Sequence, residues 1–107
     1  MTTRSDSEYS DLFLKTAKEH IQNVERLLIG YENDLSDQEL QKEIYRRIHS
    51  LKGSSLVMRH EKIANYCCKI LEFLDLEAKK NVSNNDIASL FFIVKKIHEN
   101  INSLETS

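Results

Sequence analysis

The scarcity of glycine and proline constrains the fold of this chain more than any other feature. Its 107 residues include no proline and only two glycines, Gly30 and Gly53. Tight turns between strands draw heavily on glycine and proline, and proline also marks the edges of sheets. A chain with almost none of either has few means of forming hairpins, whereas long helices need neither. The sequence therefore predicts an all-α protein.

Hydrophobic residues recur at intervals of three and four, the spacing of helices that bury one face. Four segments show it, namely about Glu8 to Gly30, Ser36 to about Met58, His60 to about Lys79, and about Ser83 to Leu104. Amphipathic helices joined by short polar links pack most simply as an antiparallel up-down four-helix bundle. The length suits one such bundle, so residues 1–107 are predicted to form a single domain.

Local signals predict where three of these helices begin or end. Gly30 suits a left-handed cap at the end of the first helix. Ser36, with Glu39 three residues later, forms a capping box that opens the second helix. Ser83 or Asn84 can cap the start of the fourth helix. These boundaries are predicted from local preferences alone.

Charge and hydropathy argue against several functions and locations. The net charge of −2 argues against a general nucleic-acid-binding protein. The longest apolar run is too short to span a bilayer, and the polar N-terminus lacks a signal-peptide core. Cys67 and Cys68 are adjacent, so they cannot easily form a disulfide and are predicted to be reduced thiols of a cytoplasmic protein.

The remaining histidines do not suggest a metal site. They are His20, His60 and His98, which lie on different predicted helices and lack the sequence spacing of metal ligands. No metal site is therefore predicted.

The stretch RRIHSLKGSS, residues 46–55, places a histidine among cations and close to a glycine. Since each helical residue turns about 100°, the apolar stripe centres roughly 140° from His49, and the imidazole is predicted to face solvent. Within about 60° of it on the same helix lie Lys42, Tyr45, Arg46, Lys52, Gly53 and Leu56. Positive neighbours favour the neutral, nucleophilic imidazole and would stabilise a phosphoryl group on it. The alternative is an ordinary solvated surface histidine.

The order of residues in this stretch resembles a known signature. His49-Ser50-Leu51-Lys52-Gly53-Ser54-Ser55, preceded by Arg46, resembles histidine-containing phosphotransfer (HPt) domains and looks similar to the phosphoacceptor domain of chemotaxis kinases. Those domains are four-helix bundles of about this size, and FLKTAKEHIQNVERLL looks like their first helix. The resemblance covers nearly the whole chain. It implies that His49 accepts and donates a phosphoryl group, that Lys52 contacts the phosphoryl oxygens, and that Gly53 lets the partner approach.

The same resemblance implies the partners, which are receiver domains of response regulators and a sensor or hybrid histidine kinase. It implies no cofactor on this chain, because Mg²⁺ belongs to the receiver. Two glycines hardly suffice for a nucleotide-binding loop, so a phosphotransfer intermediate is expected rather than a stand-alone catalyst. The predicted partner-binding residues are Gly53, Arg46, Tyr45, Leu56 and Lys42. A monomer is expected, and the initial Met together with an end just past the fourth helix favours a stand-alone protein.

Two positions depart from the family's pattern. The family commonly has glycine where the second helix turns into the third, and this chain has Arg59 there. Many members carry Glu or Gln on the third helix as a partner for the inner ring nitrogen, and the aligned residue here is Leu71. Glu72 is the nearest carboxylate, and it becomes the candidate imidazole orienter if the helix junction shifts by about one residue.

Three alternative functions stay open at this point. The chain could be the phosphoacceptor domain of a chemotaxis-type histidine kinase. It could be a helical adaptor that binds receivers or kinases without being phosphorylated, or a structural bundle with no part in a relay. Following label from phosphorylated receivers would separate these functions.

Overall fold

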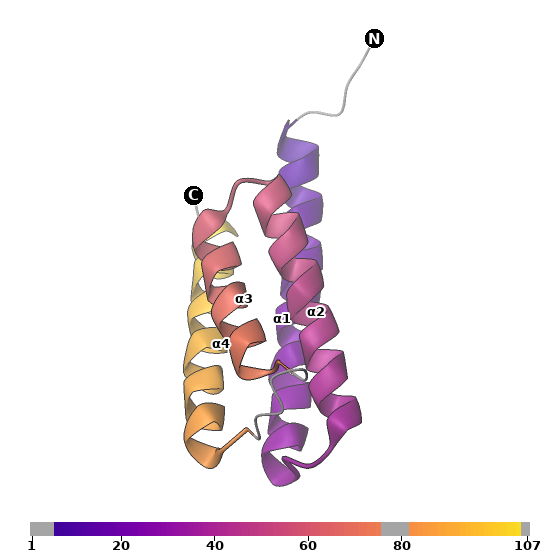
Figure 1. Cartoon of the computed structure of the whole chain (residues 1–107). Coiled ribbons are helices and arrows are strands. Elements are labelled where there is room, and N and C mark those ends of the chain that lie inside the picture. Colours follow the sequence, from indigo (N-terminus) through magenta and orange to yellow (C-terminus); the bar gives the residue numbers. More distant parts are fainter. Residues whose placement is uncertain (1–5, 76–81, 106–107) are drawn as a thin grey trace.

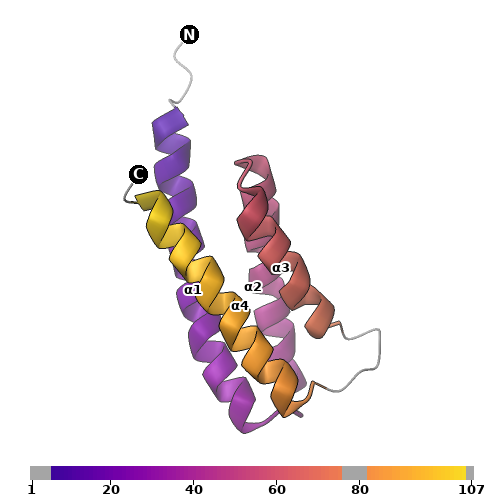
Figure 2. The same ribbon diagram turned by 90° about the vertical axis from the view of Figure 1, so that its left-hand side faces the viewer.

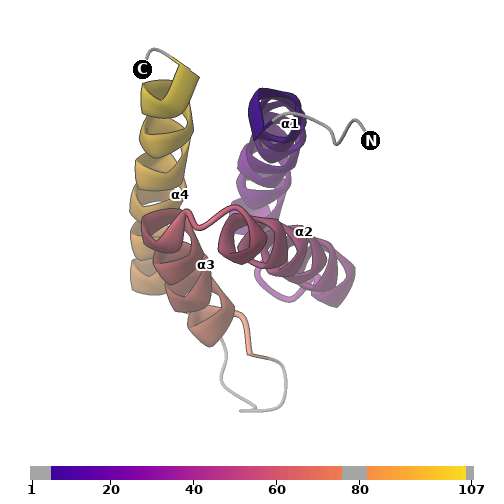
Figure 3. The ribbon, with the colours of Figure 1, turned by 90° about the horizontal axis from the view of Figure 1, so that it is seen from above.

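Four antiparallel helices make up the computed structural model, which describes residues 6–75 and 82–105. They are α1 (Asp6–Asn33), α2 (Gln38–Val57), α3 (Glu61–Phe73) and α4 (Asn84–Glu105). Successive helices run in opposite directions (Figure 1), and seen from above they stand at the four corners of a bundle (Figure 3). α1 and α3 each contact both α2 and α4. The predicted all-α, up-down four-helix bundle is confirmed.

Each helix turns its predicted apolar stripe toward one shared core. The stripe of α2 is buried at Ile44, Ile48, Leu51 and Ser55, while Leu40 and Met58 at its two ends are half-buried. The largest fully buried side chains include Tyr31, Ile21, Leu28, Ile70, Leu74, Leu90, Ile97 and Ile101. Because α2 buries its apolar stripe on one side, its opposite side is exposed and can contact other molecules.

The end of α1 differs from the prediction. The helix continues through Gly30 to Asn33, and no glycine in the described ranges has a positive φ. The next residue, Tyr31, is fully buried, so its packing extends the core stripe and outweighs the preference of glycine for a helix cap. A left-handed cap at Gly30 is therefore wrong. At the other end, α1 extends beyond its neighbours (Figure 2).

The start of α2 also differs by one residue. Asp37 is the N-cap, and its Oδ1 accepts a hydrogen bond from the backbone N–H of Leu40 at 3.1 Å. The predicted capping box of Ser36 and Glu39 is wrong, because the backbone N–H of Ser36 donates to Asp34 Oδ1 at 3.1 Å instead. That bond forms a tight turn before the helix and leaves the capping position to Asp37.

α3 is shorter than predicted, and the start of α4 agrees with its prediction. α3 begins at Glu61 and ends at Phe73, and residues 76–79 of the predicted extension lie outside the described part. Gln41 Nε2 donates to the carbonyl of Leu74 at 3.3 Å, which ties the end of α3 to α2. Ser83 caps α4, since its Oγ accepts from Asp86 N at 3.1 Å and its own N–H donates to Asp86 Oδ2 at 2.9 Å.

Arg59 has a left-handed backbone at the turn between α2 and α3. Its φ is 62°, the only positive φ of a non-glycine residue in the described ranges. The N–H of His60 donates to Ser55 O at 2.8 Å and that of Arg59 donates to Leu56 O at 3.1 Å. These two bonds are those of a Schellman motif, which usually has glycine at its left-handed residue. The turn therefore has the geometry that favours glycine, but it is built with arginine.

Replacing Arg59 by glycine is expected to stabilise the fold. A left-handed backbone costs an L-residue roughly 1–2 kcal/mol, and the greater freedom of glycine in the unfolded chain offsets about 0.5–1 kcal/mol of that gain. Arg59→Gly should thus raise the free energy of unfolding by up to about 1 kcal/mol in denaturant titrations. Arg59→Ala, which removes the same side chain but keeps Cβ, is the matched control and should bring no such gain. An Arg59→Gly protein no more stable than Arg59→Ala contradicts the prediction.

Candidate functional site

His49 lies midway along α2 on the side turned away from the core. Ile48 and Leu51 on the same turn are fully buried, whereas His49 and Ser50 are exposed. The buried pair fixes the backbone of this turn against α3 and α1. The exposure of His49 predicted by helical counting is confirmed.

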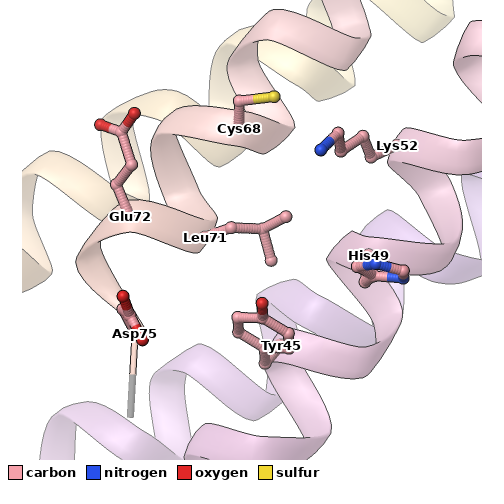
Figure 4. Close-up of a pocket in the computed structure, with 7 residues that line it drawn as sticks. All are labelled: Tyr45, His49, Lys52, Cys68, Leu71, Glu72 and Asp75. Atoms are coloured by element: carbon pink, nitrogen blue, oxygen red, sulfur yellow. The ribbon is translucent and has the colours of Figure 1, made fainter. Parts of the chain in front are cut away.

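A groove of about 650 Å³ runs between α2 and α3 beside His49 (Figure 4). Its lining consists of Tyr45, His49 and Lys52 from α2 and of Cys68, Leu71, Glu72 and Asp75 from α3 and the residues just after it. The structure thus brings together four predicted site residues, namely His49, Lys52, Tyr45 and Glu72. Sequence reasoning missed Asp75, because its position depends on α3 ending at Phe73 and not six residues later.

The ring of Tyr45 stacks on the imidazole of His49. The ring centroids are 6.2 Å apart and the ring planes differ by 17°, which lies within the range of attractive aromatic pairs. Tyr45 is half-buried and packs against the core cluster. One side of the imidazole therefore faces a ring that is itself held by the bundle.

The cations around His49 differ in whether a carboxylate neutralises them. Arg46 pairs with Glu43 one turn earlier, and Lys42 Nζ lies 3.8 Å from Glu39 Oε1. Within residues 6–75 and 82–105, no ion pair joins Lys52 to a carboxylate, and its amine points across the groove toward α3 in Figure 4. The charge of Lys52 is therefore available to an anion near His49.

The two cysteines lie on different sides of α3. Cys67 is fully buried in the core, and burial, with Cys68 beside it, raises the pKa of the Cys67 thiol to about 12. Lys52 acts in the opposite direction but more weakly. A thiol with so high a pKa stays protonated at neutral pH and is no nucleophile. Cys67 is a core residue, as predicted, and Cys68 lines the groove on the His49 side.

The surface next to His49 is open along α2. Apart from its chain neighbours and the nearby backbone of α2, no atom of the described residues lies within 4 Å of a Cβ added to Gly53, so a side chain here would have open space. Two apolar side chains are exposed there, Leu56 at 52% and Val57 at 79%. The sequence reasoning named Leu56 and missed Val57, although helical counting places Val57 about 80° from His49.

Leu71 and Glu72 point in different directions. Leu71 points from α3 toward Tyr45, whereas the carboxylate of Glu72 points away from the imidazole (Figure 4). No hydrogen bond joins Glu72 to His49 among the described residues. The helix junction at Arg59 has not turned Glu72 toward the ring, so its role as orienter stays a prediction that requires the side chain to move.

The other histidines are dispersed over the bundle. His60 stacks on Phe13 with centroids 4.8 Å apart, and His98 Nδ1 lies 3.1 Å from Glu25 Oε1. In the described part of the chain no group of three or more His, Cys, Asp or Glu side chains could hold a metal ion. Among these residues, none of the helices combines the length with the hydropathy that a membrane span requires.

Known proteins match nearly the whole chain. Residues 8–106 fit the family model of the Hpt domain. Chemotaxis protein CheA of Bacillus subtilis strain 168 is 29% identical over 100 residues, which are 94% of this chain and 14% of that protein. CheA of Listeria monocytogenes is 32% identical over 96 residues, which are 90% of this chain and 15% of that protein. The chain thus spans only a small part of the length of these curated relatives.

A solved structure shows the same arrangement of helices. The CheA phosphotransferase domain from Thermotoga maritima superposes with a TM-score of 0.86 at 26% sequence identity. The match covers 94% of this chain and 98% of the other. Over nearly the full length of both chains, the two therefore share one fold.

Proposed function

Because this chain belongs to the Hpt domain family, we propose that it carries a phosphoryl group on His49 between a donor and an acceptor domain. The observation that supports this most is the exposed imidazole of His49 one helical turn before Lys52, whose amine no described carboxylate neutralises. An exposed nucleophile can meet the active site of another protein. A nearby free cation stabilises the dianion that the ring then carries.

The proposed chemistry is a direct transfer at phosphorus. The outer ring nitrogen of neutral His49 forms a bond to phosphorus while the bond from phosphorus to the donor oxygen breaks. The donor oxygen leaves on ADP when the donor is ATP held by a kinase, or on an aspartate when the donor is a phosphorylated receiver. In the onward step an aspartate oxygen of a receiver attacks phosphorus, and the electron pair of the N–P bond returns to the ring. Mg²⁺ in both steps is expected on the partner.

The proposed docking surface lies along the exposed side of α2. Gly53 leaves the backbone bare beside His49, and Leu56 adds an exposed apolar contact. Arg46 and Lys42 border this surface, although each already pairs with a glutamate. Tyr45 lines its groove side. We propose that a receiver or kinase domain contacts these residues when it reaches His49.

The similarity to CheA favours one kind of donor. Two curated relatives are chemotaxis proteins CheA, and one solved relative is the CheA phosphotransferase domain from Thermotoga maritima. We therefore propose a chemotaxis-type histidine kinase domain as the donor and receiver domains as the acceptors. A relay protein that takes its phosphoryl group from a receiver is the second candidate, supported by the family match.

A label-transfer experiment separates these proposals. The chain is incubated with radiolabelled ATP and a CheA-type kinase domain, or with phosphorylated receivers, and label on the chain is followed over time. Label from the kinase that moves on to a receiver supports the CheA-type function, and label only from receivers supports the relay. Binding of either partner without any label supports the unphosphorylated adaptor and contradicts the proposal.

Replacing Lys52 by alanine is expected to slow phosphoryl transfer to His49. A hydrogen bond to a charged group contributes about 1.5–3 kcal/mol, and each 1.36 kcal/mol changes a rate tenfold. Lys52→Ala should therefore lower the transfer rate roughly 10- to 100-fold at saturating donor. Lys69→Ala, which removes the same charge from an exposed position where the amine lies 6.0 Å from the Tyr66 ring, is the control. An equal effect of both variants would assign the loss to net charge and not to Lys52.

A further inference from the structure

We infer that Tyr45 is a positioning residue that orients the imidazole of His49, in place of a hydrogen-bonded side chain on α3. The inference rests on the proposed function, in which His49 is the phosphoacceptor. An exposed histidine can rotate about two side-chain bonds, and a nucleophile in the wrong orientation reacts slowly. Holding a reactant near its attacking geometry is a large part of what proteins contribute to catalysis.

The ring contact supplies the orientation. Tyr45 lies four residues before His49, so the two side chains sit one above the other on α2. Their rings are nearly parallel, with 17° between the planes and 6.2 Å between the centroids. This is an offset stack, which restricts rotation of the imidazole about its own axis and leaves its edge exposed. The nitrogen at that edge stays open to a donor.

Tyr45 is itself held in place. It is half-buried and packs against the core cluster, as does Leu71 on α3. The side chains of Tyr45 and Leu71 point toward one another across the groove (Figure 4). A surface aromatic that rotates freely could not orient a neighbour, whereas a ring held between two helices can. The side chain of Leu71 cannot accept a hydrogen bond from the imidazole. It packs toward Tyr45 instead, and so helps to hold the ring that restricts rotation of the imidazole.

The polar neighbours of His49 do not provide this restraint. The carboxylate of Glu72 points away from the ring, and the amine of Lys52 points toward α3 (Figure 4). Among the described residues, the imidazole of His49 makes a ring contact with Tyr45 and no hydrogen bond to a side chain. The restraint on the nucleophile therefore comes from the aromatic pair.

The decisive experiment uses no partner protein. Phosphoramidate is a small donor, and in its reaction the outer nitrogen of His49 forms a bond to phosphorus while the P–N bond of the donor breaks and ammonia leaves. Tyr45→Leu should lower this rate roughly three- to tenfold, the size of effect that one aromatic pair allows. Tyr45→Phe keeps the ring and should restore the wild-type rate. A residue that served only to dock a partner would leave this rate unchanged.

A second measurement follows the ring directly and needs no phosphoryl donor. Carbon-13 relaxation of the His49 ring in the full chain should show a lower order parameter in Tyr45→Leu and the wild-type value in Tyr45→Phe. Tyr66→Leu, the same change at another half-buried tyrosine on α3, is the control and should alter neither rate nor order. This readout remains valid even if His49 is not the phosphoacceptor, so failure of the function and failure of the positioning are distinguishable.

Three results would overturn the inference. One is an unchanged ring order in Tyr45→Leu. Another is an equal loss of rate in Tyr66→Leu, which would indicate a general effect on the bundle. The third is a Glu72→Ala protein that loses as much rate and ring order as Tyr45→Leu, because the carboxylate of Glu72 would then be the orienter.

Discussion

A His49→Gln protein is expected to take up no acid-labile phosphoryl label from any donor, while the wild-type chain labels readily. An amide nitrogen is not nucleophilic, so the N–P bond cannot form at residue 49. The modification on the wild type should be labile in acid and stable in base, as a phosphoramidate is. His49 is exposed, and the core contacts of this turn are made by the buried residues Ile48 and Leu51. The substitution should therefore change the free energy of unfolding by no more than about 0.5 kcal/mol.

The other three histidines lie in settings that do not suit the reaction. His20 is half-buried, its Nδ1 is buried without a hydrogen-bond partner among the described residues, and burial together with nearby Arg47 lowers its pKa. His60 stacks on Phe13 and His98 pairs with Glu25. His98→Gln is the matched control and should label like the wild type. Acid-labile label on His49→Gln, or a wild type that no donor labels, would contradict the assignment of His49.

The fold could be predicted from the sequence because the core depends on a pattern and not on detail. Ile44, Ile48, Leu51 and Ser55 recur at helical spacing, and the same four positions are buried. The burial of a stripe depends on the average turn of the helix, which is nearly independent of context. Four such stripes with short links leave few arrangements other than an up-down bundle.

The helix ends could not be predicted as well, since several local preferences compete there. Gly30 carries a cap preference, but burial of Tyr31 extends the helix beyond it. Ser36 and Asp37 are both good caps, and a turn closed by Asp34 decides between them. Tertiary packing and competing side-chain hydrogen bonds determine these helix ends. Local sequence preferences do not show which of them prevails.

Some features of the candidate site could likewise be predicted from helical spacing, whereas others depend on side-chain rotamers and on packing between helices. The exposure of His49 follows from helical counting. The pairing of Arg46 with Glu43 fits their spacing of three residues on one helix, although the sequence predicted Arg46 only as a partner-binding residue. The stack of Tyr45 on His49 joins residues four apart on α2 and depends on the rotamers of the two side chains, whereas the direction of Glu72 depends on how α3 meets α2 across the groove. The junction of α2 and α3 is set by the Arg59 turn, so the sequence placed Tyr45 near His49 but showed neither the ring contact nor the direction of Glu72.

Replacing Gly53 by glutamine is expected to slow transfer between proteins strongly without destabilising the fold. Gly53 lies about 40° around α2 from His49, and beyond the nearby backbone of α2 an added Cβ would meet no atom of the described residues within 4 Å. The helix therefore has room for the new side chain. Removing a glycine from a helix interior should raise the free energy of unfolding by up to about 1 kcal/mol. A partner that must bring its phosphoryl group to the imidazole would meet the added side chain first.

The size of the effect follows from the reach of the new side chain. Misplacing reacting atoms by about 1 Å can slow a reaction roughly 100-fold, and glutamine adds several atoms beside His49. Transfer from kinase or receiver should therefore fall by roughly that factor in Gly53→Gln. Gly53→Ala adds a single carbon and should lose less, which gives a graded series measured by label transfer alongside thermal unfolding. Full transfer in Gly53→Gln would mean that the partner does not approach His49 over this turn of α2, and the docking surface would then have to lie on the groove side, toward α3.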